Sequence, residues 1–252
     1  AHAQLAPSPE VGAYAVIDAH VRLGAGCVVG PHAYLTGRLV AGPGNQFSSG
    51  AKIGVPSQDL KHEVDRIGRI EIGANNQFRE FVTVSASTLG GADEAERVTR
   101  IGSGGLFMAC AHVAHDCTVG DRVIMANSAA LSGHVKVEDG AILGGLTGIH
   151  QFTRIGRLAF IGGMSRINQD VLPYMLVEGN PAKCYGPNSV GLERAGFDAD
   201  ARRRIKACYK LLCRSGLNVT QALAAIEAQV ADAPERAHVL AFIQASSRGI
   251  TR

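Results

Sequence analysis

Divided into sixes, the chain from Ile101 to Ile167 reads IGSGGL-FMACAH-VAHDCT-VGDRVI-MANSAA-LSGHVK-VEDGAI-LGGLTG-IHQFTR-IGRLAF-IGGMSR-I. The first residue of every six is large and apolar, and the fifth is small or β-branched. An amphipathic helix does not produce this pattern, because its apolar period is 3.6 and a strict period of six drifts round its axis. The repeat predicts a hexapeptide-repeat parallel β-helix, in which each six forms one short strand and a turn and buries its large residue.

The repeat resembles that of left-handed β-helices, in which three sixes, or 18 residues, make one coil of a triangular prism. The left hand is implied by this resemblance, since ordinary crossover rules favour the other hand. Strands stack about 4.8 Å apart, so residues one coil apart lie one above another. Polar residues then form the vertical columns His115-Gly133-Gln151, Asp116-His134-Phe152 and Ala114-Ser132-His150. Together with His112, they avoid the inward positions and form an outer polar stripe.

Size and composition bound the class of protein. A chain of 252 residues has room for one large domain, or for a large and a small one. Aromatic residues make up only 5%, and the 31 glycines suit a thin aliphatic core with tight corners. A formal net charge of +3 is too mild to argue for nucleic-acid binding. Neither a signal peptide nor a run of about 18 apolar residues is present, so we expect neither secretion nor a membrane span.

The cysteines say more about the cellular compartment of the protein than about its catalytic chemistry. Six are present without a CxxC pair, in a chain too large to need disulfides for stability. Cys27 and Cys117 fall at the small inward position of their sixes, where a thiol acts as a small apolar group. This usage fits a reducing environment, and we expect a cytoplasmic protein.

The same register opens the chain at Val11, so the β-helix is expected to begin near residue 10. From Ile53 to Ile72 the step is 19, which suggests that the period is broken by one residue and that a loop around residues 58–62 projects. A polar insert interrupts the repeat again between Ser85 and Arg100. We therefore predict a β-helix domain over residues 1–184, with projecting loops near 54–71 and 85–100, which often mark a functional face.

A small helical domain is predicted over residues 185–252. The repeat ends at residues 171–174, and residues 179–182 read as a turn that closes the stack. A first helix is expected to be capped by Asp198 or Asp200 and to stop at residues 215–216. Residues 220–230 and 234–245 are expected to form two more helices, the last with Pro234 in its first turn. The first helix carries the basic residues Arg202, Arg203, Arg204, Lys206, Lys210 and Arg214.

The richest chemistry lies around His115. A neutral imidazole near pH 7 is a natural general base, and the adjacent Asp116 can fix its tautomer and stabilise the imidazolium. His134 and Gln151, one and two coils on, could hold polar groups of a substrate. Gly133, directly over His115, could present a backbone N–H to a developing oxyanion.

Two other chemistries are less well supported by the sequence. Ser132 is the nearest candidate nucleophile, but it lies about one strand spacing from His150, longer than a hydrogen bond. Direct transfer to a bound acceptor hydroxyl, with His115 as the base, is therefore favoured over a covalent intermediate. Metal binding is the sharper rival, because carbonic anhydrases of the gamma type use histidines on a similar prism. Their spacing differs from His112-x-x-His115, so we expect no metal.

Several motifs together resemble those of the UDP-N-acetylglucosamine O-acyltransferase family, which catalyses the first step of lipid A biosynthesis. The motifs are AHVAHDCTVG at 111–120, QDLK at 58–61, IHQF at 149–152 and GN at 179–180, followed by a helical tail. The sixes alone are shared by many acyl- and acetyltransferases, whereas this combination is much more specific. The match covers essentially the whole chain.

The resemblance implies a cytoplasmic homotrimer with active sites between neighbouring prisms. It implies transfer of a fatty acyl group, usually 3-hydroxylated, from acyl carrier protein to the sugar 3-hydroxyl, with no cofactor beyond the carrier's acyl-phosphopantetheine. His115 matches the general base, Asp116 its partner and Gly133 the amide that faces the thioester carbonyl. The positions that match substrate-binding residues are Asp59, Lys61, His112, His134, His150, Gln151, Asn188 and Arg194. Gly162 and Gly163 match the region that gauges acyl length, where small residues leave room for a longer chain. The basic helix, through Arg202, Arg203, Lys206 and Lys210, would dock the acidic carrier protein.

The chain departs from the family pattern at three places. Ser85-Ala86-Ser87-Thr88 stands where the family usually has His-Arg-Gly-Thr, and Val190 and Ala195 replace an acidic and a basic residue near the nucleotide. The alternatives are therefore a related acyltransferase acting on another nucleotide sugar, such as a 3-amino one, a non-catalytic paralogue that binds carrier protein or sugar nucleotide, and a metal-dependent hydratase. The His115-Asp116 pair argues against the paralogue, since a binding module has no need of a base.

Overall fold

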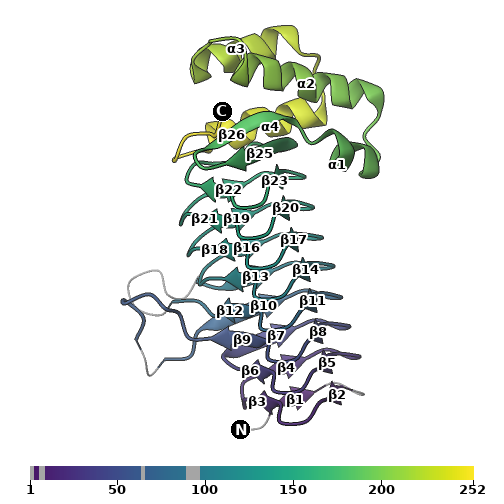
Figure 1. The fold of residues 1–252 in the computed structure, drawn as a ribbon, viewed down its shortest axis with the longest axis vertical. Helices are drawn as coiled ribbons and strands as arrows, with labels where there is room; N and C mark the ends of the chain where they lie inside the picture. Colours follow the sequence, from purple (N-terminus) through teal and green to yellow (C-terminus); the bar gives the residue numbers. More distant parts are fainter. Residues whose placement is uncertain (1–2, 6–8, 64–65, 89–96) are drawn as a thin grey trace.

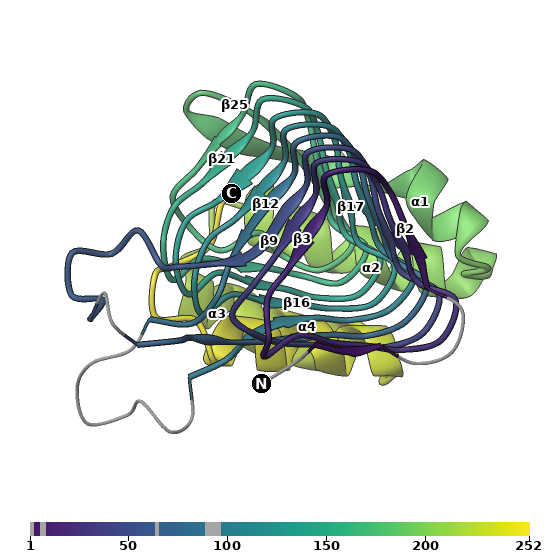
Figure 2. The same ribbon diagram turned by 90° about the horizontal axis from the view of Figure 1, so that it is seen from below.

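The chain folds into a long prism with helices at its C-terminal end, and the computed structural model describes residues 3–5, 9–63, 66–88 and 97–252 (Figure 1). Three sheets form the faces of the prism, which is triangular when it is seen end on in Figure 2. Successive strands along the chain step from one face to the next. This is the parallel β-helix that the repeat predicts, of the left-handed type that the resemblance implies.

Each face of the prism is one sheet. The first face contains β1 (Gln4–Leu5), β4 (Arg22–Leu23), β7 (Arg38–Ala41), β10 (Arg69–Ile72), β13 (Thr99–Ile101), β16 (Thr118–Val119), β19 (Lys136–Val137) and β22 (Arg154–Ile155). The second contains β2 (Glu10–Val11), β5 (Val28–Val29), β8 (Gln46–Phe47), β11 (Gln77–Phe78), β14 (Leu106–Phe107), β17 (Ile124–Met125), β20 (Ile142–Leu143), β23 (Phe160–Ile161), β25 (Met175–Gly179) and β26 (Ala182–Pro187). The third contains β3 (Val16–Ile17), β6 (Tyr34–Leu35), β9 (Lys52–Val55), β12 (Thr83–Ser85), β15 (His112–Val113), β18 (Ala130–Leu131), β21 (Gly148–Ile149) and β24 (Arg166–Ile167).

The interior of the prism is a column of stacked side chains. The rings of Phe47, Phe78 and Phe107 lie one above another, with centroids 5.2 and 4.8 Å apart. Beside them Asn45 and Asn76 are fully buried, and the Nδ2 of Asn76 donates to the Oδ1 of Asn45 at 2.9 Å. The buried amides are therefore satisfied by their neighbours in the stack, which removes the cost of an unpaired polar group.

The first coil begins earlier than predicted. In the pairing of β1 with β4, Leu5 lies opposite Leu23, so the prediction of a start near residue 10 was wrong. Leu5 precedes Val11 by six positions, and the register therefore extends one step further back than we read it.

The first insertion is longer than predicted. Ala41 pairs with Ile72, 31 positions later instead of 18, so 13 residues are looped out rather than one. The step of 19 from Ile53 was misleading, because β9 and β10 lie on successive faces, and such a step is normally six. The described part of this loop projects from the prism in Figure 2. Half of the second predicted loop, residues 89–96, lies outside the described residues.

The C-terminal part closes the prism with a hairpin and helices. β25 and β26 are antiparallel and turn at Asn180-Pro181, as the sequence predicts. The helices are α1 (Ser189–Arg194), α2 (Ala199–Cys213), α3 (Val219–Gln229) and α4 (Pro234–Gln244). The three predicted helices are confirmed, with Asp198 as the cap of α2, whereas the short α1 was not predicted. Within the described parts of the chain, no helix combines the length and apolar character needed to cross a bilayer.

Candidate active site

The polar stripe lies on the corner between the third and first faces, which we call the histidine corner. Asp116, His134 and Phe152 occupy the same turn position in successive coils, with φ of 59°, 62° and 63°. The strands before them pair with residues 18 positions apart, so the predicted columns are present. The ring of His134 stacks on that of Phe152 at 4.7 Å between centroids and meets the ring of His115 edge-on at 5.2 Å.

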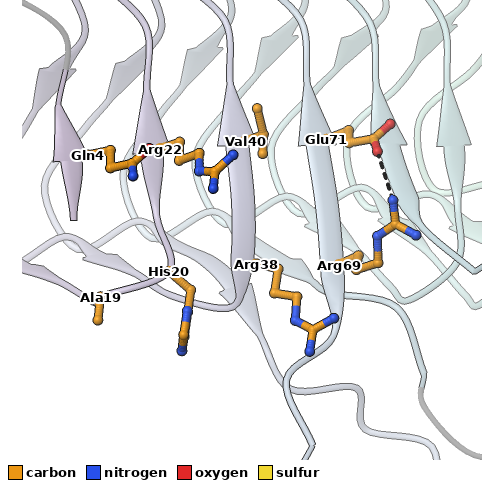
Figure 3. Close-up of a pocket in the computed structure, with 8 residues that line it drawn as sticks. All are labelled: Gln4, Ala19, His20, Arg22, Arg38, Val40, Arg69 and Glu71. Atoms are coloured by element: carbon orange, nitrogen blue, oxygen red, sulfur yellow. Dashed lines mark ion pairs between the residues drawn. The ribbon is translucent and has the colours of Figure 1, made fainter. Parts of the chain in front are cut away.

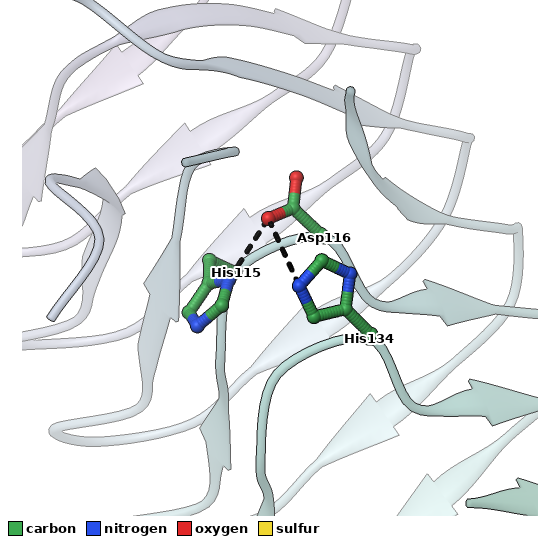
Figure 4. Close-up of side chains that lie close together, drawn as sticks. All are labelled: His115, Asp116 and His134. Atoms are coloured by element: carbon green, nitrogen blue, oxygen red, sulfur yellow. Dashed lines mark hydrogen bonds and ion pairs between the residues drawn. The ribbon is translucent and has the colours of Figure 1, made fainter. Parts of the chain in front are cut away.

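His115 and Asp116 form the central pair of the site (Figure 4). The Nδ1 of His115 lies 2.8 Å from the Oδ2 of Asp116, whose side chain is only 5% exposed. The backbone N–H of Thr88 donates to the same oxygen at 3.2 Å, and the backbone N–H of Asp116 donates to the Oγ1 of Thr99. Two hydrogen bonds thus hold the carboxylate and a third holds its backbone, and the ring of His115 is oriented by the carboxylate.

The protonation states of the pair follow from these contacts. Burial raises the pKa of Asp116, but hydrogen bonds from His115 and Thr88 outweigh it and hold that pKa below its ordinary value. An ionised carboxylate only accepts hydrogen bonds, so the Nδ1 of His115 must carry the proton that it shares with Asp116. The Nε2 of a neutral His115 is then a free lone pair, which is the arrangement a general base needs.

Two neighbouring histidines, His112 and His134, have pKa values below the ordinary value. Burial lowers the pKa of His134, against the attraction of Asp116, whose Oδ2 lies 3.8 Å from the Nε2 of His134. Burial lowers the pKa of His112, and the nearby His115 adds to this effect. The Oγ1 of Thr83 lies 2.7 Å from the Nδ1 of His112 and fixes its ring. Neutral rings can accept hydrogen bonds from sugar hydroxyls.

Gly133 lies directly against the reactive ring. A Cβ at this position would lie 2.6 Å from the Nε2 of His115 and 2.5 Å from its Cε1. Any larger residue would displace that ring. Because Gly133 has no side chain, its backbone lies directly beside the base. A backbone N–H that no side chain covers is the kind of donor that stabilises an oxyanion formed beside the base.

The projecting loop brings a second carboxylate to the other side of His115. The Oδ2 of Asp59 lies 4.0 Å from the Nε2 of His115. The Oδ1 of Asp59 accepts the backbone N–H of Lys61 at 2.9 Å, which holds the carboxylate in its turn. Asp59 therefore lies at the histidine corner, and Lys61 lies in the same turn with an exposed side chain. His150 and Gln151 lie at this corner two coils on, where the Nδ1 of His150 donates to the carbonyl of Gln151 at 3.2 Å.

Other predicted site residues lie elsewhere in the chain. Gly162 and Gly163 follow β23 and lie on the corner between the second and third faces. Asn188 and Arg194 belong to α1 and its cap, where the Asn188 side chain accepts from Gly191 and donates to the carbonyl of Leu158. Arg202, Arg203, Lys206 and Lys210 lie on α2. A single chain does not bring these residues to His115.

Sequence analysis did not predict three threonines that contact residues of the histidine corner. Thr83, Thr88 and Thr99 contact the histidine corner from the coil before it, across the second insertion. Thr88 belongs to the segment that departs from the family pattern, and its Oγ1 also lies 2.6 Å from the Oγ of Ser57 at the base of the first loop. Threonines are common in such repeats, so only their place across an interrupted coil could have marked them.

The site also contains a set of atoms that could hold a metal ion. Ligand atoms of His115, Asp116 and His134 all lie within 4.8 Å of one another. Two imidazoles and a carboxylate suit zinc. The expectation of a metal-free site stays a prediction.

A parallel β-helix of sixes with a carboxylate-paired histidine on an outer corner is typical of hexapeptide-repeat acyltransferases. Residues 170–251 match the family described as Udp N-acetylglucosamine O-acyltransferase, Domain 2. The acyl-(acyl-carrier-protein):UDP-N-acetylglucosamine O-acyltransferase of Anaeromyxobacter sp. (strain K) is 49% identical over 79% of this chain and 75% of that protein. The solved structure of LpxA from Acinetobacter baumannii matches with a TM-score of 0.94 and 36% identity, over 100% of this chain and 96% of that one. That of the Francisella novicida UDP-N-acetylglucosamine acyltransferase matches with a TM-score of 0.94 and 32% identity, over 100% and 90%. The chain belongs to the family of acyl-(acyl-carrier-protein):UDP-N-acetylglucosamine O-acyltransferases.

Proposed function

We propose that this chain transfers a fatty acyl group from acyl carrier protein to the 3-hydroxyl of UDP-N-acetylglucosamine, in lipid A biosynthesis, with His115 as the general base. Relatives that share 41 to 49% of its residues over most of its length carry the name of this reaction. The observation that carries the role of His115 is its 2.8 Å contact with the Asp116 carboxylate, which leaves Nε2 available.

The proton follows a closed path in this mechanism. The Nε2 of His115 takes the proton of the acceptor hydroxyl as its oxygen attacks the thioester carbonyl, and Asp116 stabilises the imidazolium that forms. The backbone N–H of Gly133 donates to the oxyanion of the tetrahedral intermediate. Collapse of the intermediate forms the ester and expels the phosphopantetheine sulfur, which receives the proton from His115. No cofactor is needed, because the thioester supplies the acyl group.

The residues around the base suit a sugar. Asp59, His112 and His134 surround His115 within the corner, and Lys61, His150 and Gln151 extend the polar surface along the loop and the next coils. Carboxylate, imidazole and amide groups are the usual partners of sugar hydroxyls. They would hold the acceptor with its 3-hydroxyl at Nε2.

A homotrimer completes the site in this proposal. Asn188, Arg194, Gly162 and Gly163 lie away from His115 in one chain, so a neighbouring copy would have to supply them. The corner between the second and third faces, where Gly162 and Gly163 lie, also exposes Leu146 and Met164. Their side chains are 63% and 74% exposed in the single chain. Exposed apolar residues of this kind are typical of surfaces that another copy covers.

The carrier protein would dock on α2. A groove of about 530 Å³ lies between α2 and β26, with Arg202, Arg203 and Lys206 on one side and Tyr185 and Leu192 among its apolar residues. Lys210 extends the basic surface along the same helix. Such a surface attracts an acidic partner, more through the rate of encounter than through tight affinity. All six cysteines are free, which fits the cytoplasm, where both substrates would be met.

One observation favours a second acceptor. Val190 is exposed on α1, and Ala195 caps its end, at positions where the family usually has an acidic and a basic residue. Loss of charged contacts commonly costs about 2 to 5 kcal/mol of binding. A 3-amino nucleotide sugar, which would give an amide, is therefore the alternative acceptor.

A mass-spectrometric assay separates these acceptors. Purified protein is incubated with a panel of acyl carrier protein thioesters and either UDP-N-acetylglucosamine or its 3-amino analogue. We expect the first acceptor to gain one acyl group, and long chains to be accepted because Gly163 carries no side chain. Gly162 does not add to this room, since the Glu178 side chain fills the space beside it. Acylation of the 3-amino sugar alone would favour the alternative, transfer of short chains alone would refute the length prediction, and no transfer at all would refute the proposed activity.

A further inference from the structure

A second cavity lies on the first face, near the N-terminal end of the prism. It has a volume of about 480 Å³, and Figure 3 shows the side chains that line it. Ala19 and Val40 are short, whereas the long side chains of Arg22, Arg38 and Arg69 stand around them with His20. The hollow therefore arises because short residues are surrounded by long cationic ones.

The arrangement of charge around the cavity is unfavourable in the free protein. Arg38 on β7 lies directly opposite Arg69 on β10, and like charges in this position destabilise a sheet. Glu71 pairs with Arg69 at 3.5 Å and with Arg100 at 3.2 Å, so these two cations are neutralised at least in part. Among the residues that the structure describes, no ion pair involves Arg22 or Arg38. The cavity thus has an excess of positive charge that a bound anion would neutralise.

We propose that this cavity binds a small soluble molecule that carries a diphosphate or two phosphate groups. Guanidinium groups bind phosphate oxygens in pairs, and cations from adjacent strands can bind neighbouring phosphates. The volume lies within the usual range of small-molecule sites. Ala19 and Val40 are the two apolar residues among those that line the cavity, and both are too short to bind a lipid chain.

The site is separate from the histidine corner. His20 follows β3 and His115 follows β15, which are four strand spacings apart on the third face, or about 19 Å. Arg69 is the lining residue nearest to the histidine corner, about 10 Å, or two strand spacings, below the level of Asp116. None of the lining residues belongs to that corner. The inference therefore does not rest on the proposed transferase activity, and a bound anion at this end would act on stability or regulation rather than on the reacting atoms.

The test uses inorganic pyrophosphate, isothermal titration and thermal melting of the full chain. Variants Arg38→Gln and Arg22→Gln remove one cation each, and Arg122→Gln removes an exposed cation on a different corner as the matched control. We expect pyrophosphate to raise the melting temperature of the wild type and of Arg122→Gln by about 2 to 4 °C. Each cavity variant should bind about tenfold more weakly.

A second readout separates a binding site from simple structural damage. Because Arg38 opposes Arg69, Arg38→Gln should melt at the same or a higher temperature than the wild type without pyrophosphate, while losing the rise that pyrophosphate causes. Transfer to UDP-N-acetylglucosamine by this variant should be unchanged. Pyrophosphate binding that survives in both cavity variants, binding that UDP-N-acetylglucosamine displaces, or binding only to vesicles that contain phosphatidylglycerol would each overturn the proposal. So would the absence of any effect of pyrophosphate on the wild type.

Discussion

Two corners of the prism use the same backbone turn with different residues. On the corner between the first and second faces, which we call the glycine corner, the left-handed position is held by Gly26, Gly44, Gly104 and Gly140. On the histidine corner, Asp116, His134 and Phe152 hold the equivalent position. A side chain in this conformation costs about 1 to 2 kcal/mol, which glycine avoids.

The difference shows where the sequence departs from the least strained choice. Asp, Asn and His tolerate this conformation better than most residues, and two of the three residues at the histidine corner are of this kind. Asp116 also gains hydrogen bonds from His115 and Thr88 there. The glycine corner is not uniform, since Asn75, Arg122 and Leu158 also occupy it with positive φ. Positive φ alone does not mark chemistry, since Tyr14, Phe81 and Leu146 also have it on the corner between the second and third faces. We infer that the histidine corner is distinguished by the hydrogen bonds that Asp116 makes there.

The largest effect short of removing the base should come from its partner. Asp116→Asn keeps the size of the side chain and the tolerance for the turn, but it removes the charge that stabilises the imidazolium. We expect kcat to fall by about 100-fold with little change in KM. Asp121→Asn is the control, because Asp121 accepts a similar backbone hydrogen bond, from Ser103, just before the glycine corner. Equal losses in the two variants would contradict the comparison.

Gly133→Ala should have a smaller but clear effect. Its Cβ would lie 2.6 Å from the Nε2 of His115, so the ring must move away from its working position. Displacement of a base or an oxyanion donor should lower kcat by about 10-fold or more. Gly148→Ala, where a Cβ would meet nothing within 4 Å, should keep full activity in the same steady-state assay. A fully active Gly133→Ala protein would show that the ring need not stay where the structure places it.

The histidine corner should also make stability depend on pH. The pKa values of His112 and His134 are lowered in the folded chain, so the fold favours the neutral rings. Their contribution is present above the unfolded pKa of about 6.5 and is lost as pH falls through the lower folded values. The free energy of unfolding, measured by denaturant titration, should therefore decrease between about pH 7 and pH 5. The double variant His112→Asn, His134→Asn should show a shallower decrease, and parallel curves would argue against this origin.

The smallest effect should come from the glycine corner. Gly104 has φ of 69°, and a Cβ there would meet only the Cγ of Arg122 at an ordinary 3.5 Å. Gly104→Ala should therefore lower stability by about 1 kcal/mol through backbone strain alone. Activity should not change. If thermal melting shows no loss, the turn does not penalise side chains, and the contrast between the two corners loses its energetic basis.

The periodic parts of the molecule could be predicted from the sequence, and the interruptions could not. Each six places its large residue inward whatever lies elsewhere, so the columns of His115 and Asp116 follow from counting. The 13 residues looped out before Ile72 follow no period, and a step of 19 disguised their number. The short α1 was missed for a similar reason, because a helix of six residues shows no helical period of its own.

The supporting contacts of the site also could not be predicted by counting residues along the repeat. Thr88 reaches Asp116 from the far end of a coil that the second insertion interrupts, so its spacing of 28 residues has no meaning in the repeat. Asp59 reaches His115 through a turn whose position depends on how the first loop folds back. Its presence near the base was implied only by the resemblance. Long-range contacts made by irregular segments carry no local signal in the sequence.

The most direct test of the account is the rate of acyl transfer by His115→Ala, with folding checked by thermal melting. We predict a fall in kcat/KM of about 100-fold or more, because the group that removes the proton from the acceptor hydroxyl is lost. The variant should melt near the wild-type temperature, since the left-handed turn at Asp116 remains. A folded His115→Ala protein that transfers acyl groups at the wild-type rate would contradict the assignment of the base.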